Sequence, residues 1–478
     1  MYQKFGLFLN GAWCEASDKQ SAPVFSPVTQ ESLGHVPYAT HADTAEAIAS
    51  AARAFEIWKR KTSFERADAL HLVADIMTRR RAEGATMITM ETGKPLVQSE
   101  REWNLSIDQF RWMAEEARRV YGRVVESRVP GGRFEISHEP VGVAAAFTAW
   151  NFPAALIARK VAPALAAGCS IIVRPSSQTP GVAMVMIDCI REANLPAGVV
   201  GLVVGPTSTT YAPIMASAVV RKVSLTGSTR VGQQMLRDAA DTVKKTSMEL
   251  GGNAPLIVYS DADLELALNV SVPTKFANAG QVCVTADRFF IHESLHDAFV
   301  KGFVERARAL KLGDGMDAAS QMGPLINGGR IDEMESIVES AVAAGAKVAT
   351  GGRRSPAHAK GFYFEPTVLV NVTDSMKVFE QENFGPIAAI TTFRDDDEVI
   401  ARANASEMGL SGYAFTSSAK RIRATVAGLK VGMVGINSFA MAASEAPFGG
   451  TKYSGMGREG GIEGIADYLD TKLAQIVL

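Results

Sequence analysis

The sequence predicts an α/β protein built around a doubly wound parallel sheet, with a second alternating region after it. Between residues 141 and 250, short apolar runs alternate with segments of helical periodicity, which is typical of parallel strands joined by crossover helices. The 478 residues correspond to about three domains of roughly 150 residues each. A composition of 47% apolar and 21% charged residues is ordinary for a folded globular chain.

Before the alternating region, a short strand pair and then a series of helices are expected. Thr40 or Asp43 can cap the first helix, and the apolar spacing in residues 64–83 and 99–120 favours two more. Residues 123–138 alternate charged and apolar side chains around Pro-Gly-Gly, which predicts a hairpin.

The alternating region itself contains five strand-like and four helix-like segments. The strand-like segments are residues 141–148, 170–173, 199–204, 222–225 and 246–250. The helix-like segments are residues 156–167, 182–193, 211–217 and 230–242. A sheet of this kind binds ligands at the carboxyl ends of its strands, so we expect a site at that edge.

Two further stretches complete the outline of the chain. A second alternating run extends from residues 254–258 to about residue 437. The terminal residues 468–478 are strand-like and apolar, and such a strand needs a partner, for which another subunit is one candidate. Residues 141–158 carry no charge and approach the length of a membrane-spanning helix, but Pro153 would break that helix. We therefore expect a buried strand, a loop and a helix start there.

Charge and cysteine content exclude several classes of protein. The 49 Lys and Arg nearly balance the 51 Asp and Glu, so a nucleic-acid-binding protein is not expected. Four scattered cysteines in so long a chain exclude a disulfide scaffold, and without a Cys-x-x-Cys pair structural zinc is not expected. Neither a targeting segment nor membrane association is expected. A reduced, cytoplasmic compartment fits this pattern, and there one thiol can serve as a nucleophile.

Two motifs match known site patterns but lack the required context. His292 and His296 fit the zinc pattern His-Glu-x-x-His, which needs both histidines on one helix face. Because a strand-like segment runs directly into His292, we expect the two histidines on different elements and no metal site. Residues 455–460 fit the dinucleotide pattern Gly-x-Gly-x-x-Gly, but no βαβ unit surrounds them, so we interpret them as a flexible loop.

Glu249 and Cys283 stand out as candidates for catalysis. Glu249 lies between apolar residues at the end of a strand-like segment, and burial would raise its pKa as a general base requires. A structural ion pair is the alternative for this carboxylate. Cys283 follows a glycine-containing turn, where a thiol can point into a cleft and be activated, although it can equally be a small buried apolar residue.

Six short motifs, in this order, resemble those of the aldehyde dehydrogenase superfamily over essentially the whole chain. They are Trp150-Asn151-Phe152-Pro153, Leu225-Thr226-Gly227-Ser228, Glu249-Leu250-Gly251-Gly252, Gly280-Gln281-Val282-Cys283, Phe384-Gly385-Pro386 and Pro447-Phe448-Gly449-Gly450. Each motif alone is weak, but their conjunction in order is highly specific. Residues 152–160 look most like the succinate-semialdehyde dehydrogenase branch.

The resemblance implies a role for each catalytic candidate. Cys283 would attack the aldehyde to form a thiohemiacetal and then a thioester. The side-chain amide of Asn151 and the backbone N–H of Cys283 would hold the oxyanion. Glu249 would activate the hydrolytic water, and Lys160 would support the handling of protons or of the cofactor. A non-catalytic relative would be expected to lack the nucleophile or the base, and a coenzyme-A-acylating enzyme needs no such base.

The resemblance also implies that NAD or NADP binds. Gly227 and Ser228 match the turn that meets the pyrophosphate at a helix N-terminus, where Gly232 lies in the first turns. Glu382 would hold the nicotinamide ribose. The other expected cofactor residues are Thr148, Trp150, Arg174, Ser176, Ser177, Leu250 and Phe384.

Cofactor choice and substrate are where the chain departs from the commonest family pattern. Ser177 stands where many members have a glutamate, which removes a carboxylate that would repel a 2′-phosphate, so NADP is expected to be accepted alongside NAD. Arg159 matches an arginine that binds the distal carboxylate of succinate semialdehyde. Ala277 and Ala442 replace two further polar contacts of that branch, so a less polar aliphatic or aromatic aldehyde remains an alternative.

The domain organisation implied by the resemblance has three parts. A dinucleotide-binding domain would comprise residues 1–121 and 142–252, and a smaller α/β catalytic domain would comprise residues 253–440. Residues 122–141 and 464–478 would form a β oligomerisation arm. A homodimer or a homotetramer is then expected, and the sequence does not choose between them.

Overall fold

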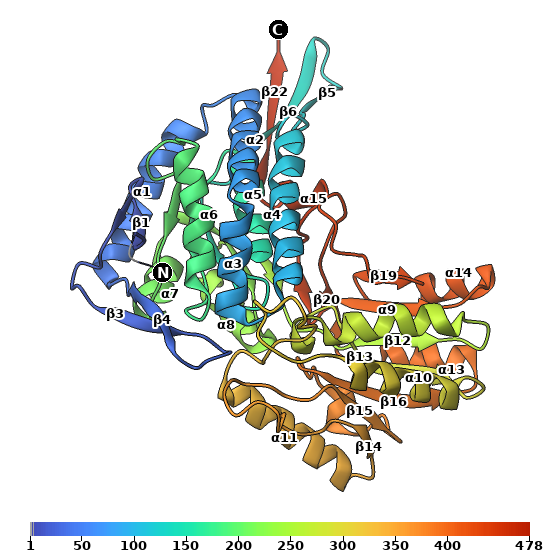
Figure 1. Cartoon of the computed structure of the whole chain (residues 1–478). Coiled ribbons are helices and arrows are strands. Elements are labelled where there is room, and N and C mark those ends of the chain that lie inside the picture. The colour runs from blue at the N-terminus through green and yellow to red at the C-terminus, as the bar shows by residue number, and fades with distance from the viewer. Residues whose placement is uncertain (1, 3) are drawn as a thin grey trace.

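The computed structural model describes residue 2 and residues 4–478 of the chain, which fold around two large sheets (Figure 1). The described strands of the first sheet run in the order β2-β1-β9-β8-β7-β10-β11-β21. They are β1 (Leu7–Leu9), β2 (Ala12–Cys14), β7 (Val143–Phe147), β8 (Ser170–Arg174), β9 (Val200–Leu202), β10 (Val220–Thr226), β11 (Lys245–Glu249) and β21 (Gly455–Met456). The five central strands are parallel, which confirms the predicted doubly wound sheet.

Helices cover both faces of this sheet. They are α1 (His41–Trp58), α2 (Ser63–Arg79), α3 (Arg81–Thr92), α4 (Leu96–Ala117), α5 (Pro153–Ala167), α6 (Pro180–Glu192), α7 (Thr207–Ala216) and α8 (Thr229–Ala240). Apolar side chains of α2 to α6 and of the last turn of α1 form one continuous core with the sheet, and those of the rest of α1, of α7 and of α8 form the core of the opposite face. Two layers of helices around one sheet explain why the strands read as uninterrupted apolar runs.

The N-terminal helices follow the sequence prediction with one error. Thr40 caps α1 in a capping box with Asp43, as the residue types predict. The helix expected over residues 64–83 instead ends at Arg79, because Arg80 leaves the helical conformation and α3 begins after it. The periodicity continues across Arg80, so the spacing of apolar residues carries no sign of this break.

The second sheet has the order β14-β15-β16-β13-β12-β18-β19 and its own apolar core. Its strands are β12 (Ala254–Val258), β13 (Ala286–His292), β14 (Lys347–Thr350), β15 (Thr367–Val370), β16 (Ile387–Phe393), β18 (Ser411–Phe415) and β19 (Met433–Ile436). The helices of this unit are α9 (Leu264–Phe276), α10 (His296–Ala309), α11 (Gly328–Ala343), α12 (Lys377–Glu380), α13 (Asp396–Asn404) and α14 (Ala419–Gly428). His292 ends β13 and His296 begins α10, so the two histidines lie on different elements.

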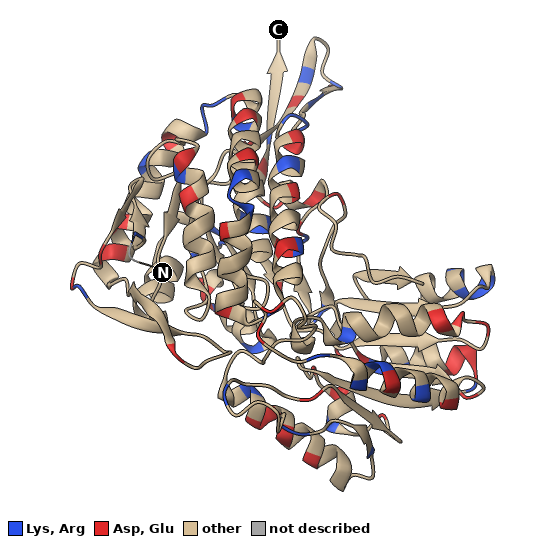
Figure 2. Cartoon of the chain, in the orientation of Figure 1, with Lys and Arg blue, Asp and Glu red and all other residues tan. Residues whose placement is uncertain are grey.

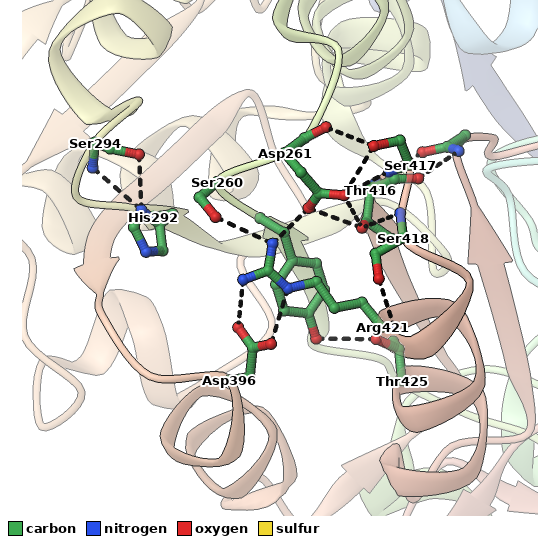
Figure 3. A network of polar contacts seen from close by, with 12 residues as sticks. Ser260, Asp261, His292, Ser294, Asp396, Thr416, Ser417, Ser418, Arg421 and Thr425 are labelled. Atoms are coloured by element: carbon green, nitrogen blue, oxygen red, sulfur yellow. Dashed lines mark hydrogen bonds and ion pairs between the residues drawn. The ribbon is translucent and has the colours of Figure 1, made fainter.

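An ion-pair network fixes the loops at one end of the second sheet (Figure 3). Arg421 of α14 contacts Asp261, which follows β12, at 2.5 Å and Asp396 of α13 at 2.8 Å. Asp261 also accepts hydrogen bonds from the hydroxyls of Thr416 and Ser417, which follow β18. These contacts tie two strand ends and two helices together through Asp261 and Arg421.

A third, three-stranded sheet projects from the body together with the C-terminus (Figure 1). It contains β5 (Arg123–Glu126), β6 (Gly132–Pro140) and β22 (Leu469–Val477), and β22 pairs with β6 along its whole length. Four small pieces complete the described part of the chain: the hairpin β3 (Ser21–Phe25) and β4 (Ser32–Pro37), the pair β17 (Met408–Gly409) and β20 (Thr451–Lys452), the 3-10 helix η1 (Ala277–Gly280) and the helix α15 (Glu463–Ala466).

Positive and negative residues are mixed along the chain, as the near-zero net charge of −2 leads one to expect. Figure 2 shows Lys and Arg interspersed with Asp and Glu over the helices. Among the helices of the described residues, none combines the length and apolar character needed to cross a bilayer. The uncharged stretch at residues 141–158 divides into β7 and the first part of α5.

Candidate active site

Two adjoining cavities lie where the carboxyl ends of the first sheet meet the second unit. The larger, of about 620 Å³, is lined by the predicted site residues Trp150, Asn151, Arg159, Gly227, Ser228, Leu250, Cys283, Glu382 and Phe384. The smaller, of about 440 Å³, is lined by Thr148, Arg174, Ser176, Ser177, Gly227 and Ser228. Thr226, Gly227 and Ser228 border both, so the cavities form one groove. The predicted residues Glu249, Lys160 and Gly232 line neither cavity.

Cys283 follows a tight turn that brings the two units together. Asn278 and Ala279 in this turn have left-handed backbone conformations, with φ of 47° and 53°. The carbonyl oxygen of Cys283 packs so closely on Gly252 that a Cβ atom there would lie 2.3 Å away. Burial, followed by the negative charges of Glu249 and Glu382, raises the pKa of the Cys283 thiol to about 12. The thiol is therefore protonated at neutral pH in the unliganded protein.

Asn151 presents its side-chain amide to the same cavity. It is buried, and its Nδ2 donates to the carbonyl of Gln281 at 3.1 Å, two residues before the nucleophile. An amide nitrogen carries two hydrogens, so one N–H remains for a ligand. Its backbone carbonyl is held by two donors, Lys94 Nζ at 2.6 Å and Asn278 Nδ2 at 3.0 Å.

Glu249 lies behind the cavity in a buried cluster of ionisable groups. Burial, reinforced by the charge of Glu459, raises the pKa of the Glu249 carboxyl well above its ordinary value, while Lys160 opposes the shift. Lys160 forms an ion pair with Glu459 and donates to the hydroxyl of Thr226 at 2.7 Å. A carboxyl of raised pKa that sits next to a second acid and a lysine can take up a proton and pass it on.

Glu459 is a site residue that the sequence did not reveal. It lies in the glycine-rich segment 455–460, and the interpretation of that segment as a flexible loop is wrong. The first two residues of the segment form β21, which pairs with β11 at Met248 and Glu249. The side chain of Glu459 is buried, with only 4% of the residue exposed. An acidic residue between glycines gives no sign of burial in the sequence. Its environment comes from partners distant in the sequence: β11, with which β21 pairs about 200 residues away, and Lys160, with which Glu459 forms an ion pair.

Arg159 lines the larger cavity from α5. It is 5% exposed, its guanidinium lies 4.1 Å from the ring centre of Phe448, and none of the ion pairs among the described residues includes it. Its Nε has no hydrogen-bond partner in the described part of the protein. A buried, unpaired guanidinium facing a cavity is a ready partner for an anion. Ala442 lines the same cavity.

The residues of the groove fit a dinucleotide. Ser228 is the N-cap of α8 and borders both cavities, so the positive end of this helix faces the groove. The smaller cavity is bordered by Arg174, Arg230 and Arg237, and no Asp or Glu lines it among residues 2 and 4–478. Such a lining suits phosphate oxygens.

Three predicted cofactor residues make contacts within the protein, and these contacts limit what each can offer to a cofactor. Arg174 donates to the carbonyl of Gly205 at 3.0 Å, so part of its guanidinium is already engaged. Gly227 donates its N–H to the carbonyl of Glu249. Gly232 is buried against Leu250, whose side chain would lie 2.5 Å from a Cβ atom. Gly232 therefore allows α8 to pack on the strand end rather than facing the groove.

Glu382 is held at the border of the larger cavity. Its Oε1 accepts the N–H of Gly252 at 3.0 Å, and burial raises the pKa of this carboxyl to about 8. Phe384, two residues later, packs edge to face against Trp150 at 5.6 Å. Glu382 thus comes within reach of both the nucleophile turn and the strand that carries Glu249.

Comparison with known proteins agrees with this geometry. The sequence profile of the aldehyde dehydrogenase family matches residues 13–474. A 3-sulfolactaldehyde dehydrogenase of Pseudomonas putida is 42% identical over 97% of this chain and 95% of its own. An NADP-dependent succinate-semialdehyde dehydrogenase of Escherichia coli is 39% identical over 97% and 96% of the two chains. The crystal structure of a succinate-semialdehyde dehydrogenase from Burkholderia pseudomallei superposes with a TM-score of 0.97 at 41% identity, over 99% of this chain and 98% of that one.

Proposed function

Because the chain belongs to the aldehyde dehydrogenase family, we propose that Cys283 is the nucleophile with which it oxidises an aldehyde to a carboxylic acid. The observation that carries this assignment is one cavity whose lining combines Asn151 of the first unit with Cys283 and Glu382 of the second. The Cys283 thiol gives its proton to water as its sulfur attacks the aldehyde carbon, and the product is a thiohemiacetal oxyanion. The free N–H of the Asn151 amide and the backbone N–H of Cys283 stabilise that oxygen.

The dinucleotide would bind along the groove formed by the two cavities. When bound, NAD or NADP supplies the nicotinamide ring that accepts the hydride, which leaves a thioester on Cys283. The positive end of α8 at Ser228 would meet the phosphates, and Glu382, which lines the larger cavity, would hold ribose hydroxyls. Use of NADP is supported by the arginine-rich, acid-free lining of the smaller cavity and by the NADP dependence of the Escherichia coli relative.

Hydrolysis of the thioester is assigned to Glu249. With a raised pKa, its carboxylate takes a proton from water that attacks the thioester carbon, and the thiol of Cys283 is released. The ion pair of Lys160 and Glu459 lies next to this carboxylate and supports transfer of the proton onward.

The proposed substrate is a short aldehyde that ends in an anion. The unpaired guanidinium of Arg159 supports this class, and the named substrates of both sequence relatives carry a sulfonate or a carboxylate. Oxidation of a less polar aldehyde is a weaker alternative, supported by the alanine at position 442 in the cavity wall.

Two experiments test these assignments. Cys283→Ala should abolish the absorbance of reduced nicotinamide with every aldehyde, while Cys14→Ala, a half-buried thiol in β2, should leave it intact. If Cys283→Ala retains turnover, the assignment of Cys283 as the nucleophile is wrong.

For the substrate, succinate semialdehyde and butanal differ only by the terminal carboxylate. Arg159→Met should lower kcat/KM about tenfold or more for the first and little for the second. Equal losses for both aldehydes would exclude the carboxylate role.

The projecting sheet is proposed to join subunits into a homodimer or a homotetramer. The outer edge of β22 carries the exposed residues Leu473 and Val477, and β22 lies at the end of its sheet in the strand order β22-β6-β5. Residues 122–141 and 464–478 are thus assigned to this arm, beside a cofactor domain of residues 1–121 and 142–252 and a catalytic domain of residues 253–440. Light scattering of the purified chain should give a multiple of the 51.0 kDa protomer mass.

A further inference from the structure

A buried ion pair lies behind the loop that carries Asn151. Lys94, just after α3, donates from Nζ to Glu102 Oε2 at 2.8 Å and to the backbone carbonyl of Asn151 at 2.6 Å. The side chains of Lys94 and Glu102 are 0% and 1% exposed. Neither residue lines the cavity, so neither is placed to contact substrate.

The second oxygen of Glu102 caps a helix of the site. Glu102 Oε1 accepts the N–H groups of Ala154 at 2.8 Å and Ala155 at 3.3 Å, in the first turn of α5. Phe152, which occupies the N-cap position, makes no such bond with its side chain. A carboxylate from α4 therefore replaces the local cap that the sequence of α5 lacks.

Lys94 acts on the residues between Asn151 and this cap. Its ammonium lies 4.0 Å from the ring centre of Phe152, which lines the cavity. The ion pair thus holds the carbonyl of Asn151, the ring of Phe152 and the start of α5 at once. The carbonyl of Asn151 also accepts a bond from Asn278, at the turn before Cys283, so Lys94 and the nucleophile turn meet at one oxygen atom.

A buried ion pair is weak evidence for stability, because desolvation of two charges offsets most of their attraction. An apolar pair of similar volume would fill the space without a charge. What an apolar pair could not do is donate to the Asn151 carbonyl and accept from the α5 N–H groups. The contacts that only the charged pair can make hold the carbonyl of Asn151 and the start of α5, and so fix the backbone next to the Asn151 side chain.

From this geometry we propose that Lys94 and Glu102 are positioning residues that hold the Asn151 amide in the place where it stabilises the oxyanion. The proposal rests on the role of Asn151 in the proposed function. A shift of about 1 Å in such a group can lower a rate by roughly a hundredfold. We therefore expect loss of these contacts to lower kcat with little change in KM for the aldehyde.

The test separates charge compensation from positioning. Lys94→Met leaves Glu102 as an unpaired buried carboxylate, so both stability and rate should fall. The double variant Lys94→Met, Glu102→Gln removes both charges, and the Gln oxygen can still accept from Ala154. Its melting temperature should return toward that of the native protein, whereas kcat should stay roughly ten- to a hundredfold low because the bond to the Asn151 carbonyl is still missing. If kcat recovers together with stability, the pair is structural and the proposal is wrong.

Two controls make the outcome specific. Lys244→Met removes another buried lysine, which donates to the carbonyls of Ser217 and Val220 away from the cavities, and should cost stability without a comparable loss of kcat. Asn151→Ala tests the premise. If it leaves the single-turnover rate unchanged, the proposed role of Asn151 fails. If it lowers that rate, adding the Lys94 and Glu102 changes should lower it no more than about twofold further, because the positioned amide is already gone. A full additional loss in that background would overturn the positioning role alone.

Discussion

Gly252 and Cys283 are in contact through their backbones: a Cβ atom on Gly252 would lie 2.3 Å from the carbonyl oxygen of Cys283. This contact joins the loop after β11 to the nucleophile turn of the second unit. We predict that Gly252→Ala moves the thiol and lowers kcat roughly a hundredfold.

The matched control for this substitution is Gly201→Ala in β9, where the nearest atom is 3.7 Å from an added Cβ. It should retain activity within about twofold. A Gly252→Ala protein with native kinetics would show that the two backbones can separate without consequence.

The resting thiol of Cys283 should react slowly with alkylating agents. Because burial and two nearby carboxylates raise its pKa to about 12, the thiolate fraction should rise about tenfold per pH unit up to at least pH 9. The measurement is the rate of inactivation by iodoacetamide between pH 6 and pH 9 without cofactor. A plateau below pH 9 would contradict the raised pKa.

Glu459 and Lys160 should move the pH dependence of turnover in opposite directions. The charge of Glu459 raises the pKa of Glu249 and that of Lys160 lowers it. When hydrolysis limits turnover, kcat rises with pH as Glu249 loses its proton. Glu459→Gln should therefore shift this limb to lower pH, by about one unit.

Lys160→Met serves as the opposed control, because loss of its positive charge should shift the same limb to higher pH. Profiles of kcat for the three proteins with one aldehyde provide the measurement. Shifts of the same sign in both variants would mean that electrostatics of this cluster do not set the pKa of the base.

A carboxylate at position 177 should change the cofactor preference. Ser177 borders the smaller cavity with three arginines and no described acid. Ser177→Glu is expected to lower kcat/KM for NADP about a hundredfold by repelling the 2′-phosphate, while NAD retains most of its efficiency. The ratio of the two efficiencies decides the outcome, and an equal loss with both cofactors would place the phosphate elsewhere.

The network around Arg421 should stabilise the fold except in acid. Its hydrogen bonds and ion pair hold the pKa of Asp261 well below its ordinary value, although burial opposes them. A lowered pKa in the folded state means that stability is gained above the ordinary carboxyl pKa and is lost as pH falls toward the folded value. Asp261→Asn should thus lower the melting temperature at pH 7, and the difference should shrink below about pH 5. A difference independent of pH would exclude this linkage.

The sequence predicted the fold and the central residues of the site for a physical reason. Parallel strands buried on both faces leave long apolar runs, and the groups around Cys283 lie in short motifs whose order along the chain is specific. The break at Arg80 was missed because apolar spacing continues through it. The sequence gives no sign of the roles of Glu459, Lys94 and Glu102, because each role depends on a partner more than 50 residues away along the chain.

The pairing of β21 with β11 has a consequence for the order in which the enzyme folds during its synthesis. The strand that carries Glu249 is completed by Gly455 and Met456, and its base is flanked by Glu459, all more than 170 residues after Cys283 along the chain. During translation, the nucleophile and the cofactor groove are made long before this segment leaves the ribosome. The nascent chain can therefore fold most of its sheets while the environment of the hydrolytic base is still absent, and the complete reaction cycle becomes available only after residues 455–459 have emerged and paired with β11.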